Sequence, residues 1–335
     1  MVMLARAFVT LGLIGASCGN AHADVLADRP APFVIRDQNP FIQIYGLPPL
    51  EAADVTPSRR TRSQIVFDLA NSSRLADSAN ESISLDGETY RLALSVRHGV
   101  SDHLEVGVEI PLVFHRGGVL DDFIEGWHDF LGLANGERDK TPSNALDYSY
   151  RFQGQELIAI RSGQQGLGDI RLFAATPLYQ ADDGGRGVSL RGSVELPTGD
   201  SARLLGSGST DLALSINAVE RSLSSYRITG YGQLGLLASS DGDVLAAQQR
   251  HWVAFGGVGL SWRAGDRVDL KAQLDGHGSF YQSELSQLGS RSVQLTFGGT
   301  IYFGRATALD LAVGENLFAD TIPDLLIHAA VSHRN

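Results

Sequence analysis

The stretch YRLALSVRHGVSDHLEVGVEIPL, residues 90–112, decides the fold, because apolar and polar side chains alternate on both sides of a short polar turn. Leu94 and Val96 share one face of a first strand, and Val106 and Val108 share the corresponding face of a second. Alternation with a period of two predicts β-strands. The two halves therefore predict an antiparallel hairpin with one apolar face and one charged face.

Cross-strand pairing gives this hairpin a register. With the turn centred on Ser101, the charged face pairs Arg97 with Glu105. Turns centred on positions 183, 222, 265 and 306 predict four more hairpins of the same kind. Their expected pairs include Ile170–Leu196, Arg171–Glu195, Asn217–Arg227, Leu260–Leu270 and Ile301–Leu311.

The same alternation continues along the chain. It predicts twelve strands, at residues 62–70, 87–98, 103–114, 168–179, 187–197, 209–219, 225–237, 251–263, 266–280, 292–304, 307–314 and 324–333. Short turns alternate with longer polar connections, among them 71–86 and the longest, 115–167. An even strand number with this alternation is typical of bacterial transmembrane β-barrels, in which the long loops are extracellular and the short turns periplasmic. We therefore expect an all-β, antiparallel transmembrane barrel.

The N-terminal residues predict export. Residues 1–23 have the pattern of a secretory signal peptide, with an apolar run followed by Ala21-His22-Ala23. Cys18, the only cysteine, lies within them, so we expect no thiol chemistry in the mature chain. We expect residues 24–61 to form an N-terminal periplasmic segment and residues 62–335 to form the barrel.

Composition narrows the functional class. The net charge is −11, which argues against a nucleic-acid partner, since such a partner needs a basic face. No run of 18 apolar residues follows the signal sequence, so we expect no transmembrane helix. No zinc-type ligand spacing is present, and we expect neither a metal nor a cofactor. His277 and Ser279 lie two apart on one strand, but no third residue is clearly placed to orient them for catalysis, so we do not expect an enzyme.

Periodicity alone leaves one alternative open. A soluble lipocalin-like barrel also alternates, but its apolar face points inward. Export, the rhythm of the loops and the aromatic residues at strand ends favour the membrane protein. The expected aromatic belt residues are Tyr90, Phe114, Trp252 and Phe280 at one boundary and Tyr226, Trp262 and Phe303 at the other.

The polar face of the predicted strands supplies the candidate functional residues. The pore-lining candidates are Arg91, Arg97, Glu105, Glu109, Arg171, Arg191, Glu195, Asp211, Arg227, Lys271, Asp275 and His277. Rings of such charges can set ion selectivity in an open pore. Alternatively, paired Arg and Glu side chains crosslink the interior and block it. A barrel of this size permits both.

The long connection 115–167 interrupts the strand pattern with DDFIEGWHDFLGL, residues 121–133. Phe123, Trp127 and Phe130 are candidates for a lid over the barrel mouth, or for a cap that only stiffens its rim. A further hairpin is expected after this segment, turning at Gln153-Gly154.

Four stretches carry a resemblance to a known family: NPFIQIYGLPPL (39–50), residues 86–139 with the distinctive motif DDFIEGWHDFLGL (121–133), GLGDIRL (166–172) and ELPTGD (195–200). The chain resembles the Gram-negative family catalogued as domain of unknown function 3187, which is similar in outline to phenol-degradation-type outer-membrane channels. The resemblance implies an outer-membrane barrel in contact with lipid and lipopolysaccharide, and it adds no catalytic residue. The sequence departs from many outer-membrane strands by ending in AAVSHRN rather than on an aromatic residue.

Together these features predict a passive pore or transporter for a small solute. The alternative is a non-transporting structural or surface-interaction barrel, plugged by its own charges and by the 115–167 loop.

Overall fold

The computed structural model describes residues 30–118, 145–316, 321 and 323–335. The strands are β1 Thr61–Asp77, β2 Glu81–Ser101, β3 Leu104–Arg116, β4 Asp147–Phe152, β5 Gln155–Ile160, β6 Gln164–Leu167, β7 Ile170–Gln180, β8 Arg186–Leu196, β9 Asp211–Glu220, β10 Ile228–Ser239, β11 Trp252–Gly265, β12 Val268–His277, β13 Ser292–Phe303, β14 Thr307–Asn316 and β15 Leu325–Arg334. The short helices are η2 Ser201–Arg203, η3 Ser222–Tyr226 and α2 Ser286–Gly289. In the described part of the chain, no helix has the length and apolar character needed to cross a membrane.

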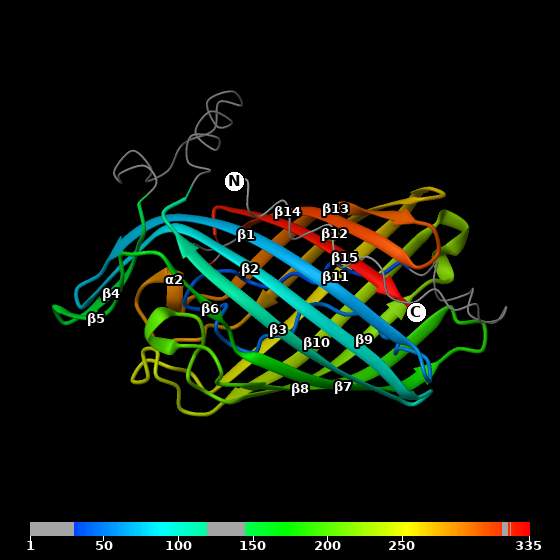
Figure 1. Cartoon of the computed structure of the whole chain (residues 1–335), viewed down its shortest axis with the longest axis horizontal. Coiled ribbons are helices and arrows are strands. Elements are labelled where there is room, and N and C mark those ends of the chain that lie inside the picture. Colours follow the sequence, from blue (N-terminus) through cyan, green and yellow to red (C-terminus); the bar gives the residue numbers. More distant parts are fainter. Residues whose placement is uncertain (1–29, 119–144, 317–320, 322) are drawn as a thin grey trace, which may run out of the picture.

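Twelve of these strands, β1–β3 and β7–β15, form a closed antiparallel barrel (Figure 1). Each strand pairs with its neighbours around the wall; β3 pairs with β7, and β15 returns to pair with β1. Closure leaves none of these strands with an open edge, as a barrel in lipid requires. The predicted fold class and strand number are therefore confirmed.

The apolar face of the barrel points outward. Leu94 and Leu260 keep 45% and 58% of their surface exposed, whereas their neighbours Ser95 and Ser261 are buried. A water-soluble barrel would show the opposite arrangement. The exposed Leu, Val, Phe and Trp side chains therefore form the lipid-facing surface of an outer-membrane barrel. Phe280 was expected in the aromatic belt, and this is wrong: it is fully buried, because β12 ends at His277 and the chain turns inward.

The predicted register is confirmed for one hairpin, in which Arg171 pairs with Glu195. Elsewhere the predicted register is wrong. The pairs found are Arg97–Gly107, Gly99–Glu105, Asn217–Gln233, Leu260–Ala272 and Ile301–Leu309. Two of the pairings are shifted by two residues and lie beside irregularities at Gly99/Ser101 and Arg263/Gly265, and η3 lengthens another turn. Each shift is even, so the side chains of these paired strands keep their predicted faces.

The predicted loop 71–86 is also wrong. Residues 71–77 and 81–86 continue β1 and β2 well beyond the barrel rim and leave only a tight turn between them. The further hairpin predicted at Gln153-Gly154 is confirmed as β4–β5, with a φ of +50° at Gln153 and +79° at Gly154. Strand β4 pairs with the extended part of β2, so the wall is tallest on this side.

The expected periplasmic placement of residues 24–61 is contradicted for the part that the structure describes. Residues 30–57 run through the inside of the barrel, where most of their side chains are buried (Figure 1, blue). We call residues 30–57 the plug segment. The end of the barrel that carries the turns near 102, 183 and 305 is the short-turn end, and the opposite end is the long-loop end.

The lipid-facing surface gives a first prediction. Leu260 lies in the outward row of β11 between Val258 and Trp262. We expect Leu260→Arg to destabilise the folded barrel by up to about 2 kcal/mol, because a charge would face hydrocarbon between the bilayer midplane and the boundary marked by Trp262. Urea titration of the protein in lipid vesicles, read as a heat-modifiable gel shift, measures the change. Leu223→Arg, in the exposed turn of η3, is the control and should unfold like the parent.

Candidate functional site

The plug segment follows from its own sequence. It contains six prolines, at positions 30, 32, 40, 48, 49 and 57. Proline cannot donate a backbone hydrogen bond, so this segment is a poor strand. Its buried backbone groups must still find partners. Side chains on the lumen wall provide them: Phe33 N donates to Gln273 Oε1 (2.9 Å), Gly46 N to Asp211 Oδ2 (2.7 Å) and Thr56 N to Glu105 Oε2 (2.7 Å).

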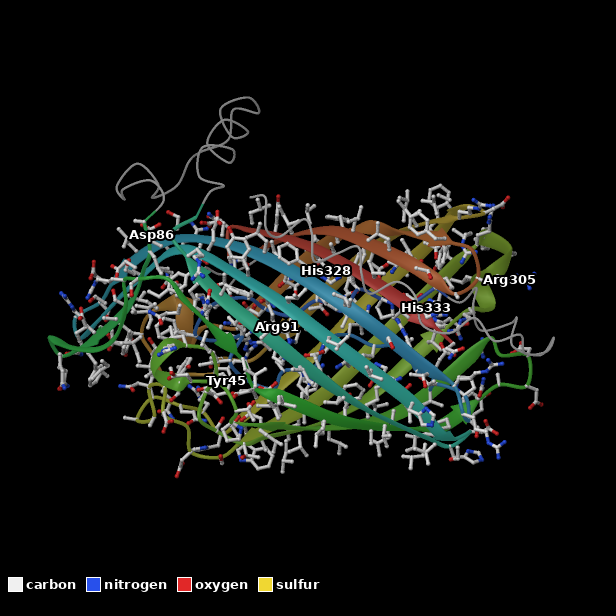
Figure 2. The ribbon with its side chains drawn as sticks, in the orientation of Figure 1. Tyr45, Asp86, Arg91, Arg305, His328 and His333 are labelled. Atoms are coloured by element: carbon white, nitrogen blue, oxygen red, sulfur yellow. The ribbon has the colours of Figure 1, made fainter. Side chains whose placement is uncertain are left out.

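At the long-loop end, the plug segment closes the barrel with a hydrophobic cluster. Tyr45 stacks on Phe280 with ring centroids 4.7 Å apart, and Tyr281 donates to the carbonyl of Phe41 (2.9 Å). The cluster also includes Ile42, Ile44, Leu47, Ile83, Leu85, Tyr148, Tyr150, Leu204, Leu237, Val253, Leu285 and Leu288. In Figure 2, Tyr45 lies toward this end and Arg305 toward the other. The predicted lid residues Phe123, Trp127 and Phe130 lie outside the described residues.

The middle of the lumen is crossed by an ion-pair network around Glu109. Its carboxylate accepts hydrogen bonds from Arg91 (2.6 Å) and Arg171 (3.0 Å), which come from neighbouring wall strands. Arg36 of the plug segment lies 3.5 Å from the same carboxylate and 3.8 Å from that of Glu195. All five side chains are almost completely buried. The plug segment and the wall therefore share one set of charges.

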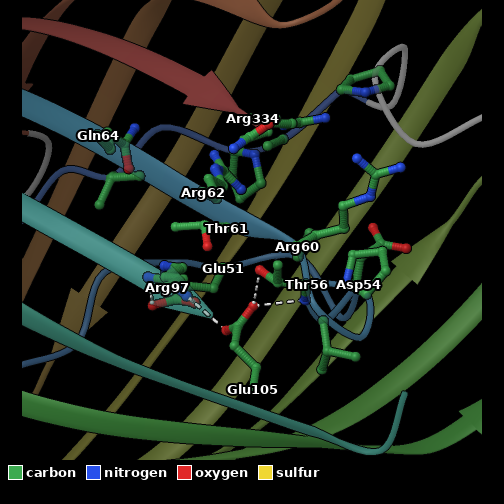
Figure 3. A pocket seen from close by; sticks show the side chains of 18 of the residues that line it. Glu51, Asp54, Thr56, Arg60, Thr61, Arg62, Gln64, Arg97, Glu105 and Arg334 are labelled. Atoms are coloured by element: carbon green, nitrogen blue, oxygen red, sulfur yellow. Dashed lines mark hydrogen bonds and ion pairs between the residues drawn. The ribbon is translucent and has the colours of Figure 1, made fainter. Parts of the chain in front are cut away.

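A second network lies nearer the short-turn end. Glu51 of the plug segment accepts from Arg97 Nη2 (2.8 Å) and lies 2.9 Å from Arg191. Glu105 lies 3.2 Å from Arg97 (Figure 3) and 2.9 Å from Arg191. Two arginines and two carboxylates thus alternate. The sequence placed Arg97 beside Glu105, and the two do form an ion pair, although they are not register partners.

The remaining candidates also have partners in the lumen. Lys271 contacts Asp310 (2.9 Å), Asp211 accepts from Ser209 Oγ (2.6 Å), and Asp275 accepts from Gln273 Nε2 (2.8 Å). His277 Nε2 lies 3.0 Å from Asp37 Oδ2, and its Nδ1 lies 2.7 Å from the carbonyl of Gly278. One candidate is misplaced: Arg227 precedes β10 with a φ of +60° and is exposed beside Asp266. Its placement in the lumen was wrong.

Sequence reasoning missed the plug residues Arg36, Asp37 and Glu51, which complete the networks. The signal was present in PFIQIY, residues 40–45, which is too apolar for a segment surrounded by water. It also missed the buried pair of His328 Nδ1 and Asp68 Oδ1 (2.6 Å). Within the described residues, no group of three or more His, Cys, Asp or Glu side chains is arranged to hold a metal ion.

The cavities show where the lumen is filled. Two small cavities of about 20 Å³ flank the plug segment in mid-barrel, one beside Phe255 and His277 and one beside Arg171 and Asn217. A much larger cavity of about 470 Å³ lies at the short-turn end, between the plug segment and the wall (Figure 3). The barrel is therefore tightly filled at the long-loop end and in the middle, and hollow at the short-turn end.

Comparison with solved structures supports the architecture. The chain is similar to the COG4313 outer membrane channel from Pseudomonas putida F1, with 12% identity over 84% of this chain and 98% of that chain, and a TM-score of 0.57. Weaker likenesses are to the NanC porin (5% identity, 81% of this chain and 97% of that chain, TM-score 0.45) and to the KdgM porin (8% identity, 81% and 98%, TM-score 0.40). At these identities the likeness to the COG4313 channel shows the fold alone.

No curated protein matches the chain. The model of one family, described as protein of unknown function (DUF3187), matches residues 14–335. The resemblance carried by the four sequence stretches is thereby confirmed. The chain belongs to the DUF3187 family, and it forms an outer-membrane β-barrel.

Proposed function

We propose that this protein is a gated passive channel for a small solute, and that the plug segment is its gate. The observation that supports this most directly is how the plug is held. It occupies a charged lumen through hydrogen bonds, ion pairs and side-chain packing, without pairing to any described strand of the sheet. Displacement of the plug would leave a wall lined by Arg91, Glu109 and Arg171, which water can solvate.

The closed state is stable because polar contacts of the plug match those of the wall one by one. Arg36 forms ion pairs with Glu109 and Glu195, and Glu51 forms ion pairs with Arg97 and Arg191. Water can replace each of these contacts once the lumen opens. The free-energy difference between the closed and the open state is therefore smaller than the number of contacts suggests. Opening also has to break the hydrophobic cluster around Tyr45, which is the larger barrier.

That cluster is the observation that favours a second function. A barrel sealed by Phe41, Tyr45, Phe280 and Tyr281 is also suited to a non-transporting structural role at the cell surface, where its long-loop end would meet lipopolysaccharide. In either role we propose no catalysis at His277, since both of its ring nitrogens already lie beside oxygen atoms of Asp37 and Gly278.

Gly46 provides the test that separates the two. A Cβ at this position would lie 3.0 Å from the Cβ atoms of both Asp211 and Glu195, so a larger side chain must push the plug off the wall. Overpacking of this kind costs about 1–3 kcal/mol, and such a free energy shifts a two-state equilibrium about 5- to 150-fold. We expect Gly46→Leu to raise the open probability of single channels in planar bilayers by a factor in this range.

Gly232→Leu is the matched control, because a Cβ there meets nothing within 4 Å. It should conduct like the parent. If Gly46→Leu folds, as shown by its heat-modifiable mobility, and yet remains as silent as the parent, the plug is not a gate and the structural role is favoured.

A further inference from the structure

The cavity at the short-turn end has two unlike walls (Figure 3). The plug segment contributes an apolar wall formed by Pro30, Pro32, Val34, Leu50 and Val55. The other side is rich in charge: six arginines at positions 60, 62, 97, 191, 305 and 334, against three carboxylates at 51, 54 and 105. Its volume of about 470 Å³ falls within the range of small-molecule sites.

The sheet register concentrates positive charge on one strip of this wall. Arg62 of β1 is the direct partner of Arg97 on β2 and of Arg334 on β15. Three arginines thus lie side by side across three adjacent strands, and all three line the cavity. Like charges directly opposite one another destabilise a sheet. Such a row persists only where anions offset it.

The protein supplies such anions to Arg97. Arg97 is bound by Glu51 and Glu105. Arg62, in the middle, forms no hydrogen bond or ion pair through its side chain with the residues that the structure describes, and its Nε is buried without an acceptor. Gln64 Nε2, on the same face of β1, is also buried without an acceptor, as is Arg191 Nε across the cavity. All three unsatisfied groups are N–H donors, and of the two arginines Arg62 is the one whose side chain has no carboxylate partner among the described residues.

We propose that this cavity binds a small organic carboxylate, with its anionic group at Arg62 and its apolar body against Pro30, Pro32 and Val34. A guanidinium matches a carboxylate with two parallel hydrogen bonds. The apolar wall gives the remainder of the molecule a surface to bury. An inorganic anion would leave that wall uncovered, and a neutral compound would leave Arg62 without a counter-charge.

This inference deepens the proposed function by naming the class of solute. The short-turn end faces the periplasm in bacterial barrels. A carboxylate held there occupies the inner mouth of the channel, just below the network of Glu51 and Glu105. Binding at the cavity does not require the plug to move, so it can be measured on the closed protein.

The experiment measures equilibrium binding to the full-length protein in detergent, by calorimetry at fixed salt. Three probes separate the contributions: benzoate has both the anionic group and the apolar body, benzyl alcohol lacks the charge, and inorganic phosphate lacks the apolar body. We expect benzoate to bind at least tenfold more tightly than either of the others, because benzyl alcohol cannot form a charge-assisted hydrogen bond with Arg62 and phosphate has no apolar surface to bury.

Arg62→Gln keeps polarity and most of the side-chain length but removes the charge. We expect it to weaken benzoate binding about tenfold or more. The matched control is Arg59→Gln, because Arg59 is exposed three residues earlier and does not line the cavity. It should bind benzoate like the parent.

Two results would overturn the inference: equal affinity for benzoate and benzyl alcohol, or unchanged benzoate binding by a folded Arg62→Gln variant. If phosphate bound as tightly as benzoate, the proposal that the solute has an apolar part would be wrong. Conductance is read separately. If the protein binds benzoate but never conducts, the binding site is supported and the channel function is refuted. If it conducts but binds no benzoate, the channel function is supported and the binding site is refuted.

Discussion

Deletion of residues 30–57 is expected to turn a mostly silent protein into one that conducts continuously in planar bilayers. The plug segment is the described part of the chain that fills the lumen and anchors the seal around Tyr45. It pairs with no described barrel strand, so its removal leaves the closed ladder of twelve strands intact. The wall left behind is polar and will hydrate. Single-channel recording and heat-modifiable mobility, measured on the same preparation, test both halves of this expectation.

The deletion also allows a control in trans. A synthetic peptide with the sequence of residues 30–57 should close the deleted barrel again, because Arg36 and Glu51 would recover Glu109, Arg97 and Arg191 as partners. A peptide of the same composition in shuffled order should leave conductance unchanged. Silence of a correctly folded deletion variant would refute the gate. Closure by both peptides would show non-specific block.

The faces of the barrel strands could be predicted from sequence because facing depends only on parity. Side chains alternate between the two faces of a strand with a period of two residues. This period is enough to place Leu94 and Leu260 toward lipid and Arg97 and Lys271 toward the lumen. Register depends on the length of each turn. The irregularity at Gly99/Ser101 and the helical turn η3 change that length without any strong local signal. A register shift by an even number of residues leaves each side chain on the same face of the sheet. The predicted faces were therefore right in hairpins whose predicted pairs were wrong.

The candidate site could be predicted only on the wall side. Parity placed Glu109 and Glu195 in the lumen, but their partner Arg36 lies far earlier in the chain, in a segment with no period. Prolines removed the alternation that identifies strands, and the rule that early residues of a barrel lie in the periplasm then misplaced the segment. Long-range ion pairs between irregular and regular segments have no sequence signature of their own.

The second large effect is expected at Glu109. This carboxylate lies among Arg91, Arg171 and Arg36, and all four groups are buried. Glu109→Gln removes the negative charge and leaves three guanidinium groups close together. Breaking a buried ion pair by removing one partner costs about 3–5 kcal/mol, and we expect a loss of folding stability in that range. Urea titration in lipid vesicles, with heat-modifiable mobility as the readout, gives the value.

Glu156→Gln is the matched control. Glu156 also bridges two arginines, Arg151 and Arg161, but on the exposed β4–β5 hairpin. Water screens such pairs, so this variant should unfold like the parent. The contrast between the two glutamates measures how dry the middle of the lumen is. A loss below about 1 kcal/mol at Glu109 would mean that water reaches the network even in the closed state.

The two large effects are coupled, and the coupling separates a gate from a scaffold. If the plug keeps the lumen dry, its deletion lets water reach the ion-pair network around Glu109. Glu109→Gln should then reduce folding stability much less in the deleted barrel than in the full chain. The double-mutant cycle isolates this interaction, since the two changes share Arg36 as a partner of Glu109. If Glu109→Gln costs the same in both backgrounds, the wall charges hold each other without the plug. The barrel would then remain blocked by its own side chains after the plug is removed.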